Sequence, residues 1–134
     1  MNILFFLKPK ETIEYIESTF SIRQTLEKLD VHGYSAIPII DQDGCYLNTI
    51  SDGDILMYLK NNTNLDLKKA EDLSILLVKI RRDVKSIKIN ENMEDLLELS
   101  LNQNFIPVVD DLNHFIGIIT RKDIIKYFYE RNGL

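Results

Sequence analysis

Hydrophobic and polar residues follow one another along this chain in a short cycle that occurs twice. In each cycle, apolar positions at helical spacing come first, then two short apolar runs separated by a turn, and then a second helical pattern. The spacing predicts helices over 22–31, 52–60, 93–101 and 121–131, and strands over 37–40, 46–50, 106–109 and 115–119. Leading strands are predicted over 13–16 and 86–89, with Ser21 and Asn92 as N-caps of the helices that follow them.

The two cycles are copies of one unit. A shift of 69 positions aligns residues 37–59 with 106–128 without a gap, and 7 of these 23 pairs are identical and another 7 conservative. Because an ungapped match of this kind is not expected by chance, we infer an internal duplication.

Turn signals and linker composition complete the predicted organisation. Asp43-Gly44 is a strong hairpin signal in the first copy, and Asn113 is a weaker one in the second. Residues 65–80 alternate leucines with charged residues, which predicts an amphipathic connecting helix. The expected organisation is a first repeat over 1–62, a connecting helix over 63–80 and a second repeat over 81–134. The fold class is α/β (α+β), with two pseudo-symmetric β-α-β-β-α repeats packed together, because each repeat alone is too small for a stable core.

Composition narrows the classes of protein. The 134 residues carry a net charge of −5, which argues against nucleic-acid binding through a general basic surface. The single cysteine, Cys45, excludes an internal disulfide framework and fits a cytoplasmic location. No apolar run is long enough to span a bilayer. The first seven residues lack the basic region and cleavage site of a signal peptide, so we expect them to be part of the fold.

Each repeat places a hydroxyl residue and an aspartate at the start of its last helix, as Ser51-x-x-Asp54 and Thr120-x-x-Asp123. One interpretation is a capping box, in which these side chains satisfy the first backbone N–H groups of the helix. The other is a nucleotide site, in which the carboxylate accepts hydrogen bonds from ribose hydroxyls and the helix start attracts phosphate. The spacing alone leaves both open.

The residues quoted above resemble the CBS domain, the cystathionine β-synthase type of regulatory domain. The similarity rests on Ile106-Pro107-Val108-Val109-Asp110 and on the run from Phe115 to Asp123, and the whole chain resembles a tandem CBS pair, or Bateman module. The resemblance implies that Thr120 and Asp123 contact a nucleotide and that residues around the two prolines border its adenine ring. It also implies that the basic segments before each leading strand, 8–10 and 81–85, border the cleft between the repeats. The first copy departs from the family pattern at Asn48, where a glycine is usual.

Charge separates the two copies. Residues 120–131 carry a net charge of +2, whereas the matching residues 51–62 carry −1, so phosphate should prefer the second copy. Arg121 offers a planar fork to phosphate oxygens and Lys122 a point charge, although both could equally be a solvated helix start. The full set of predicted nucleotide-binding residues is Thr120, Asp123, Arg121, Lys122, Gly117, Ile106, Pro107, Arg82, Ser51, Asp54, Ile37, Pro38 and Lys10.

No catalytic or metal-binding constellation is evident in the sequence. Phosphate-binding glycine loops of the two common kinds are missing, and the spacing of His32 and His114 is not that of metal ligands. Cys45 lies beside a turn with no histidine nearby in sequence, so we do not expect it to be a nucleophile. We therefore expect a protein that is not an enzyme, needs no cofactor and binds no metal.

Three functional hypotheses follow. The first is a regulatory module that binds an adenine nucleotide (AMP, ADP, ATP or cyclic di-AMP) and signals to a separate protein partner by a population shift. The alternative is a structural or interaction module with vestigial nucleotide sites, and the third, least supported, is a nucleotide hydrolase. We also expect a homodimer, with no nucleic acid and no membrane insertion. The apolar helix positions expected to form the dimer face are Ile55, Leu56, Leu59, Ile124, Ile125 and Phe128.

Overall fold

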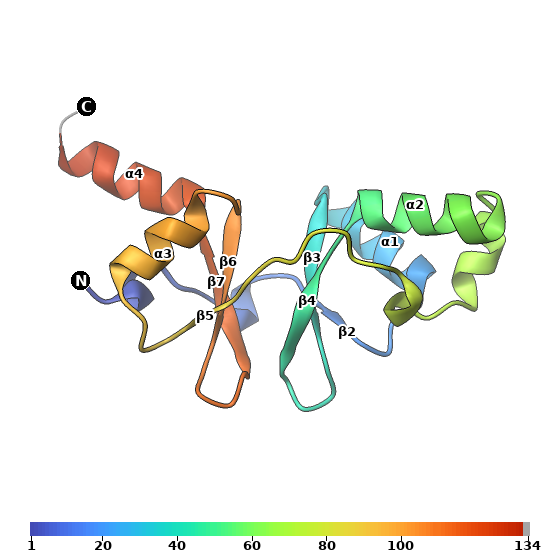
Figure 1. The fold of residues 1–134 in the computed structure, drawn as a ribbon, viewed down its shortest axis with the longest axis horizontal. Helices are drawn as coiled ribbons and strands as arrows, with labels where there is room; N and C mark the ends of the chain where they lie inside the picture. The colour runs from blue at the N-terminus through green and yellow to red at the C-terminus, as the bar shows by residue number, and fades with distance from the viewer. Residues whose placement is uncertain (133–134) are drawn as a thin grey trace. The chain divides into compact units, whose positions relative to one another are not determined.

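A computed structural model describes residues 1–132 of the chain, which form two compact units, each with its own sheet and helices (Figure 1). Unit 1 contains Met1–Ile13, Gly44–Tyr46 and the described chain from Val84 onward. Unit 2 contains Glu14–Asp43 and Leu47–Asp83. Both combine helices and strands, so the fold class predicted from the sequence is confirmed.

Unit 2 holds a three-stranded sheet of order β2-β3-β4, with β2 (Ile16–Glu17) parallel to β3 (Ala36–Ile40), which is followed in the chain by β4 (Tyr46–Ser51). Helices α1 (Ile22–His32) and α2 (Asp52–Thr63) lie on the same side of this sheet (Figure 1). The core is built from fully buried isoleucines at the positions where the helical and strand periods face inward. These include Ile16, Ile22, Ile37, Ile50 and Ile55.

The connecting helix predicted over 63–80 is wrong. The segment instead contains two short 3-10 helices, Leu67–Glu71 and Ile75–Leu77. Asn64 and Leu65 adopt positive φ and end α2. Ser74 is extended, because the backbone on either side of it bonds to Phe20 and Ile22, and this separates the two 3-10 helices. The segment belongs to unit 2, and its Ala70, Ile75 and Val78 complete that core, whereas Leu65, Leu67, Leu76 and Leu77 are exposed.

Unit 1 holds a four-stranded sheet of order β1-β7-β6-β5. Its strands are β1 (Lys8–Pro9), β5 (Ile87–Lys88), β6 (Phe105–Val109) and β7 (Phe115–Thr120). Helices α3 (Met93–Ser100) and α4 (Arg121–Arg131) flank the sheet (Figure 1). The core includes Ile87, Leu96, Ile106, Val108 and Ile119, none of them accessible to solvent.

The first thirteen residues belong to unit 1, although the sequence analysis counted them with the first repeat. A 3-10 helix, Ile3–Phe6, buries Ile3 and Phe6 in the unit 1 core, and a further 3-10 helix, Lys10–Thr12, follows β1. Strand β1 then pairs antiparallel with β7, placing Pro9 opposite Gly117. The N-terminal segment is therefore an edge strand of the sheet that carries the second motif.

The predicted helices and main strands are confirmed to within a few residues at their ends. Ser21 and Asn92 both cap their helices in reciprocal capping boxes, with Gln24 and Asp95 as the returning side chains. Asn113 and Gly44 adopt positive φ in the turns that the sequence placed there. No helix among residues 1–132 is long and apolar enough to cross a membrane.

Candidate functional site

The start of α4 in unit 1 presents the second motif. Thr120 is the N-cap, and its hydroxyl oxygen accepts a hydrogen bond from the backbone N–H of Asp123 at 3.2 Å. The carboxylate of Asp123 does not return to the cap backbone and instead lies 3.4 Å from the Nζ atom of Lys8. Its side chain is 35% exposed, and Lys8 is its one partner among residues 1–132. A carboxylate beside a helix N-terminus with unused acceptor capacity can bind hydroxyl donors.

The start of α2 in unit 2 presents the first motif in a different state. Ser51 and Asp54 form the complete capping box, with bonds of 3.0 Å and 3.1 Å in the two directions. The other carboxylate oxygen of Asp54 accepts from the Nε atom and from the backbone N–H of Arg81, at 3.1 Å and 3.3 Å. The Asp54 side chain is only 6% exposed. The capping interpretation is therefore confirmed in full at Ser51 and by half at Thr120, whereas the nucleotide interpretation stays a prediction.

The surroundings of Asp54 also set its ionisation. Burial of the carboxyl raises its pKa, but the hydrogen bonds from Ser51 and from the Arg81 guanidinium outweigh burial and hold the pKa below its ordinary value. The group is thus a buried, fully paired carboxylate, a partnered state that explains why a charged residue is tolerated in the core.

Gly117 and Asn48 occupy matching positions in the two copies and explain part of this difference. Gly117 has a φ of 153°, and a Cβ there would collide with the carbonyl oxygen of Lys8. We expected the missing side chain to admit a ligand, whereas the structure shows that the backbone of β1 fills this space. In unit 2 the Asn48 side chain instead donates to the carboxylate of Asp83 at 3.0 Å.

The predicted phosphate ligands at α4 are partly engaged elsewhere. The Nε atom of Arg121 donates to the carbonyl of Gln103 at 3.3 Å, and Lys122 is exposed beside it. Both line an open hollow of about 520 Å³ along α4, with Asn104, Ile125, Lys126 and Tyr129. Their role in holding phosphate stays a prediction.

The basic segments before the leading strands contribute different residues from those we selected. The sequence analysis chose Lys10 and Arg82, but the structure brings Lys8 to Asp123 and Arg81 to Asp54. Each segment was identified correctly as basic, yet only the fold shows which member reaches the motif. Lys10 lies in the short 3-10 helix after β1, and Arg82 is exposed.

The apolar site residues are mainly core. Ile37 and Ile106 are fully buried in units 2 and 1 respectively, and the adjacent prolines Pro38 and Pro107 are buried too. Their contact with an adenine ring stays a prediction.

Cys45, beside the first turn, and His114, beside the second, lie closer than their spacing in the sequence indicated. Cys45 and His114 form an isolated antiparallel bridge within unit 1, and the Cys45 thiol donates to the carbonyl of Leu112 at 3.6 Å. His114 Nδ1 lies 3.0 Å from the carboxylate of Asp110. Sequence spacing could not show that this bridge brings the two backbones together, and the expectation that Cys45 is not a nucleophile stays a prediction. Among residues 1–132, no group of three or more histidine, cysteine or acidic residues is arranged to hold a metal ion.

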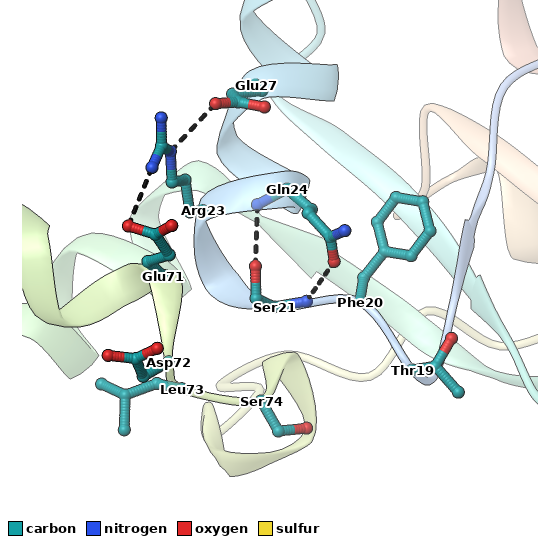
Figure 2. A pocket seen from close by; sticks show the side chains of 10 residues that line it. All are labelled: Thr19, Phe20, Ser21, Arg23, Gln24, Glu27, Glu71, Asp72, Leu73 and Ser74. Atoms are coloured by element: carbon teal, nitrogen blue, oxygen red, sulfur yellow. Dashed lines mark hydrogen bonds and ion pairs between the residues drawn. The ribbon is translucent and has the colours of Figure 1, made fainter.

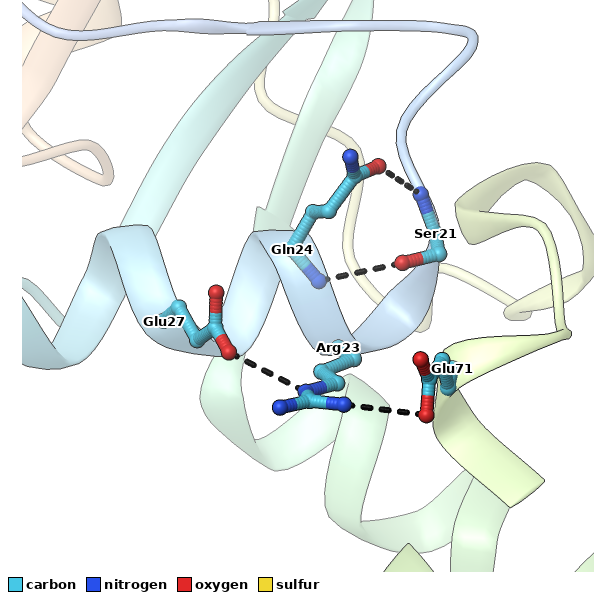
Figure 3. Close-up of polar contacts among 5 residues, drawn as sticks. All are labelled: Ser21, Arg23, Gln24, Glu27 and Glu71. Carbon is cyan, nitrogen blue, oxygen red and sulfur yellow. Dashed lines mark hydrogen bonds and ion pairs between the residues drawn. The ribbon is translucent and has the colours of Figure 1, made fainter. Parts of the chain in front are cut away.

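A second hollow, of about 600 Å³, lies at the start of α1 in unit 2 (Figure 2). Its walls are tied together by Arg23, which bonds to Glu27 at 3.1 Å and to Glu71 at 2.9 Å (Figure 3). With Asp72 also present, acidic groups outnumber Arg23, and the Ser21–Gln24 capping box occupies the first helical N–H groups. This hollow therefore does not suit a phosphate group.

Half of the residues that we expected to form a dimer face are buried inside their own unit. Ile55, Leu59 and Ile124 are buried in the cores of their own units, because they lie on the helix face that packs against the sheet. Leu56 is 56% and Ile125 58% exposed. Among the six residues chosen for a dimer, Leu56, Ile125 and Phe128 thus remain accessible.

Comparison with known proteins agrees with this architecture. The sequence-family model of the CBS domain matches two ranges of this chain, residues 8–61 and 71–130. CBSX2, a chloroplastic CBS domain-containing protein of Arabidopsis thaliana, is 26% identical over 144 aligned positions that cover 90% of this chain. The chain spans only 60% of the length of that relative.

Two crystal structures give the same result. CbpB in complex with c-di-AMP superposes with a TM-score of 0.87 at 26% identity, covering 97% of this chain and 85% of that one. CbpB of Listeria monocytogenes, also in complex with c-di-AMP, superposes with a TM-score of 0.83 at 26% identity, covering 95% and 94%. The two matched ranges, the duplicated motif and these similarities lead to one conclusion: the chain belongs to the CBS domain family and contains two CBS domains.

Proposed function

We propose that this chain is a regulatory protein that binds an adenine nucleotide at the start of α4 and passes the signal to a separate protein partner. The observation that carries the proposal is the state of Asp123, a carboxylate at a helix N-terminus with one partner, Lys8, and a side chain 35% exposed. Ribose hydroxyls are suitable donors to this group. The backbone N–H groups of Arg121 and Asp123 already donate to Asn104 and Thr120, so the positive end of the helix dipole and the exposed Lys122 are what favour phosphate here. The likeness to CbpB structures that hold c-di-AMP supports an adenine nucleotide as the ligand class.

Signalling would follow from differential binding. A nucleotide that binds one conformation of the chain more tightly shifts the population toward it, and a coupling of about 1–3 kcal/mol is enough for a useful switch. No catalytic step is part of the proposal, which needs neither a cofactor nor a metal.

We also propose that the chain forms a homodimer through its helices. An open groove of about 560 Å³ in unit 1 lies between α3 and α4. It is bordered by exposed apolar side chains, among them Leu97, Leu101, Ile125 and Phe128. A second copy of the chain would bury this apolar surface, and two-fold dimers are the commonest oligomers.

The test is a thermal-shift panel with AMP, ADP, ATP, c-di-AMP and S-adenosylmethionine. A ligand that binds only the folded state raises the melting temperature as its concentration rises above the dissociation constant. We expect a shift with one or more of the adenine nucleotides. If none of them shifts the melting temperature at millimolar concentration, the regulatory proposal is wrong and the alternative of a structural module stands.

One observation favours that alternative for the first motif alone. Asp54 is buried and has its hydrogen bonds satisfied within the chain. These contacts support a structural role for the start of α2.

A further inference from the structure

We propose that Arg81 is an internal occupant of the first motif, so that the chain binds nucleotide at the second motif and excludes it from the first. The inference rests on the proposed function and extends it to the number of ligands that one chain holds. It makes Arg81 a specificity-determining residue. Arg81 was not among the binding residues predicted from the sequence.

The hydrogen bonds at Asp54 carry the argument. A ribose would offer this carboxylate two hydroxyl donors, and Arg81 already offers two, its Nε atom at 3.1 Å and its backbone N–H at 3.3 Å. The second carboxylate oxygen accepts from the backbone N–H of Ser51 at 3.1 Å. With its side chain 6% exposed, Asp54 has no accessible acceptor left for a ligand.

The guanidinium also fills the space above the first turn of α2. A Cβ placed at Gly53 would lie 2.7 Å from an Nη atom of Arg81, so the arginine rests directly on the backbone at this point. The matching residue in the second copy is Lys122, which is exposed. A ligand could therefore approach the start of α4 but not that of α2.

A hydrogen bond two residues further along the chain holds the segment that carries Arg81 in place. Asp83 accepts from the side chain of Asn48 at 3.0 Å, on the strand that leads to Ser51. At the matching position in unit 1, Gly117 lets the backbone of Lys8 pair with β7, and only the flexible Lys8 side chain reaches Asp123, at 3.4 Å. Both cations are partly exposed, Lys8 at 47% and Arg81 at 55%, so the aspartates make the difference. Displacing Arg81 would leave a carboxylate that is only 6% exposed without its charged partner, whereas Asp123 is 35% exposed and can be hydrated.

The experiment counts binding sites in the full chain. AMP and c-di-AMP are each titrated by calorimetry into the unsubstituted protein, Arg81→Gln and the charge-matched control Lys79→Gln, an exposed residue of the same segment. We expect the unsubstituted protein and the control to bind at one motif, and Arg81→Gln to gain a second, so that the nucleotide bound per chain doubles. Adding Asp54→Asn to Arg81→Gln should remove the gained site.

The alternative outcomes separate this inference from the proposed function. If Arg81→Gln binds no more nucleotide than the unsubstituted protein, or loses binding, Arg81 is not an occupant and the inference is overturned. If only Arg81→Gln binds, the exclusion of nucleotide from the first motif by Arg81 stands, and the assignment of binding to the second motif fails. If neither protein binds, both are overturned. Arg81→Lys, which keeps the charge but not the Nε donor, serves in the same titration if Arg81→Gln fails to fold by circular dichroism, and it too should gain a site.

Discussion

Replacing Asp123 by alanine tests the proposed site directly. The backbone N–H of Asp123, which bonds to the Thr120 hydroxyl, is kept in the variant. The change removes a carboxylate whose only partner within the described chain is Lys8, with side chains 35% and 47% exposed. Such an exposed ion pair contributes about 0–1 kcal/mol, so we expect the free energy of unfolding to fall by no more than that.

The expected effect on nucleotide affinity is larger. A hydrogen bond between a hydroxyl and a charged group contributes about 1.5–3 kcal/mol, so its loss should weaken binding by at least about tenfold. Calorimetry at 25 °C, well below the melting transition, measures this change separately from stability.

Asp54→Asn is the matched control. Because Asp54 is buried and paired with Arg81, its substitution should lower stability and leave affinity within about twofold. If Asp54→Asn abolishes binding in a protein that remains folded, while Asp123→Ala leaves affinity intact, the ranking of the two motifs is reversed and our reasoning is refuted.

Three further predictions concern stability and assembly. Because the pKa of Asp54 is lowered in the folded state, the ionised carboxylate stabilises the fold above its unfolded pKa of about 3.9, and this stabilisation is lost as the pH falls below that value. In urea denaturation between about pH 7 and pH 3, the free energy of unfolding should therefore fall less for Asp54→Asn than for the unsubstituted protein. Gly117→Ala should destabilise the protein by more than about 1 kcal/mol, since its Cβ would collide with the Lys8 carbonyl at a φ of 153°, whereas Asn48→Ala should cost less; equal midpoints in urea would contradict this. Sedimentation should give a dimer for the unsubstituted chain and a monomer for Ile125→Asp, which alters an exposed side chain; a monomer near 15.6 kDa in both cases would disprove the dimer.

The sequence predicted most of the local structure because short-range rules determine it. The helical and strand periods located the elements, and the capping residues Ser21 and Asn92 marked helix starts correctly. The duplicated Ser/Thr-x-x-Asp motif was found for the same reason, since the hydroxyl and the carboxylate lie within one helical turn.

Features that depend on distant residues could not be read from the sequence. The leucines of 65–80 have helical spacing, but the backbone around Ser74 is extended and bonds to Phe20 and Ile22, which are more than 50 positions away. Pairing of Lys8–Pro9 with β7 depends on Gly117, more than 100 positions away. Spacing arguments also missed the bridge between Cys45 and His114.

The two motifs show how duplicated copies can diverge without changing the motif itself. Both keep the hydroxyl cap and the aspartate, so the motif alone predicts equal sites. The difference lies in the basic segment that reaches each aspartate. In one copy, glycine at 117 admits a paired strand, and Lys8 leaves the carboxylate partly exposed. In the other, Arg81 satisfies and covers the carboxylate. If the proposed function is right, Arg81 takes the place that ribose donors would have at Asp54, and a residue outside the motif decides whether the aspartate binds a ligand or stabilises the fold.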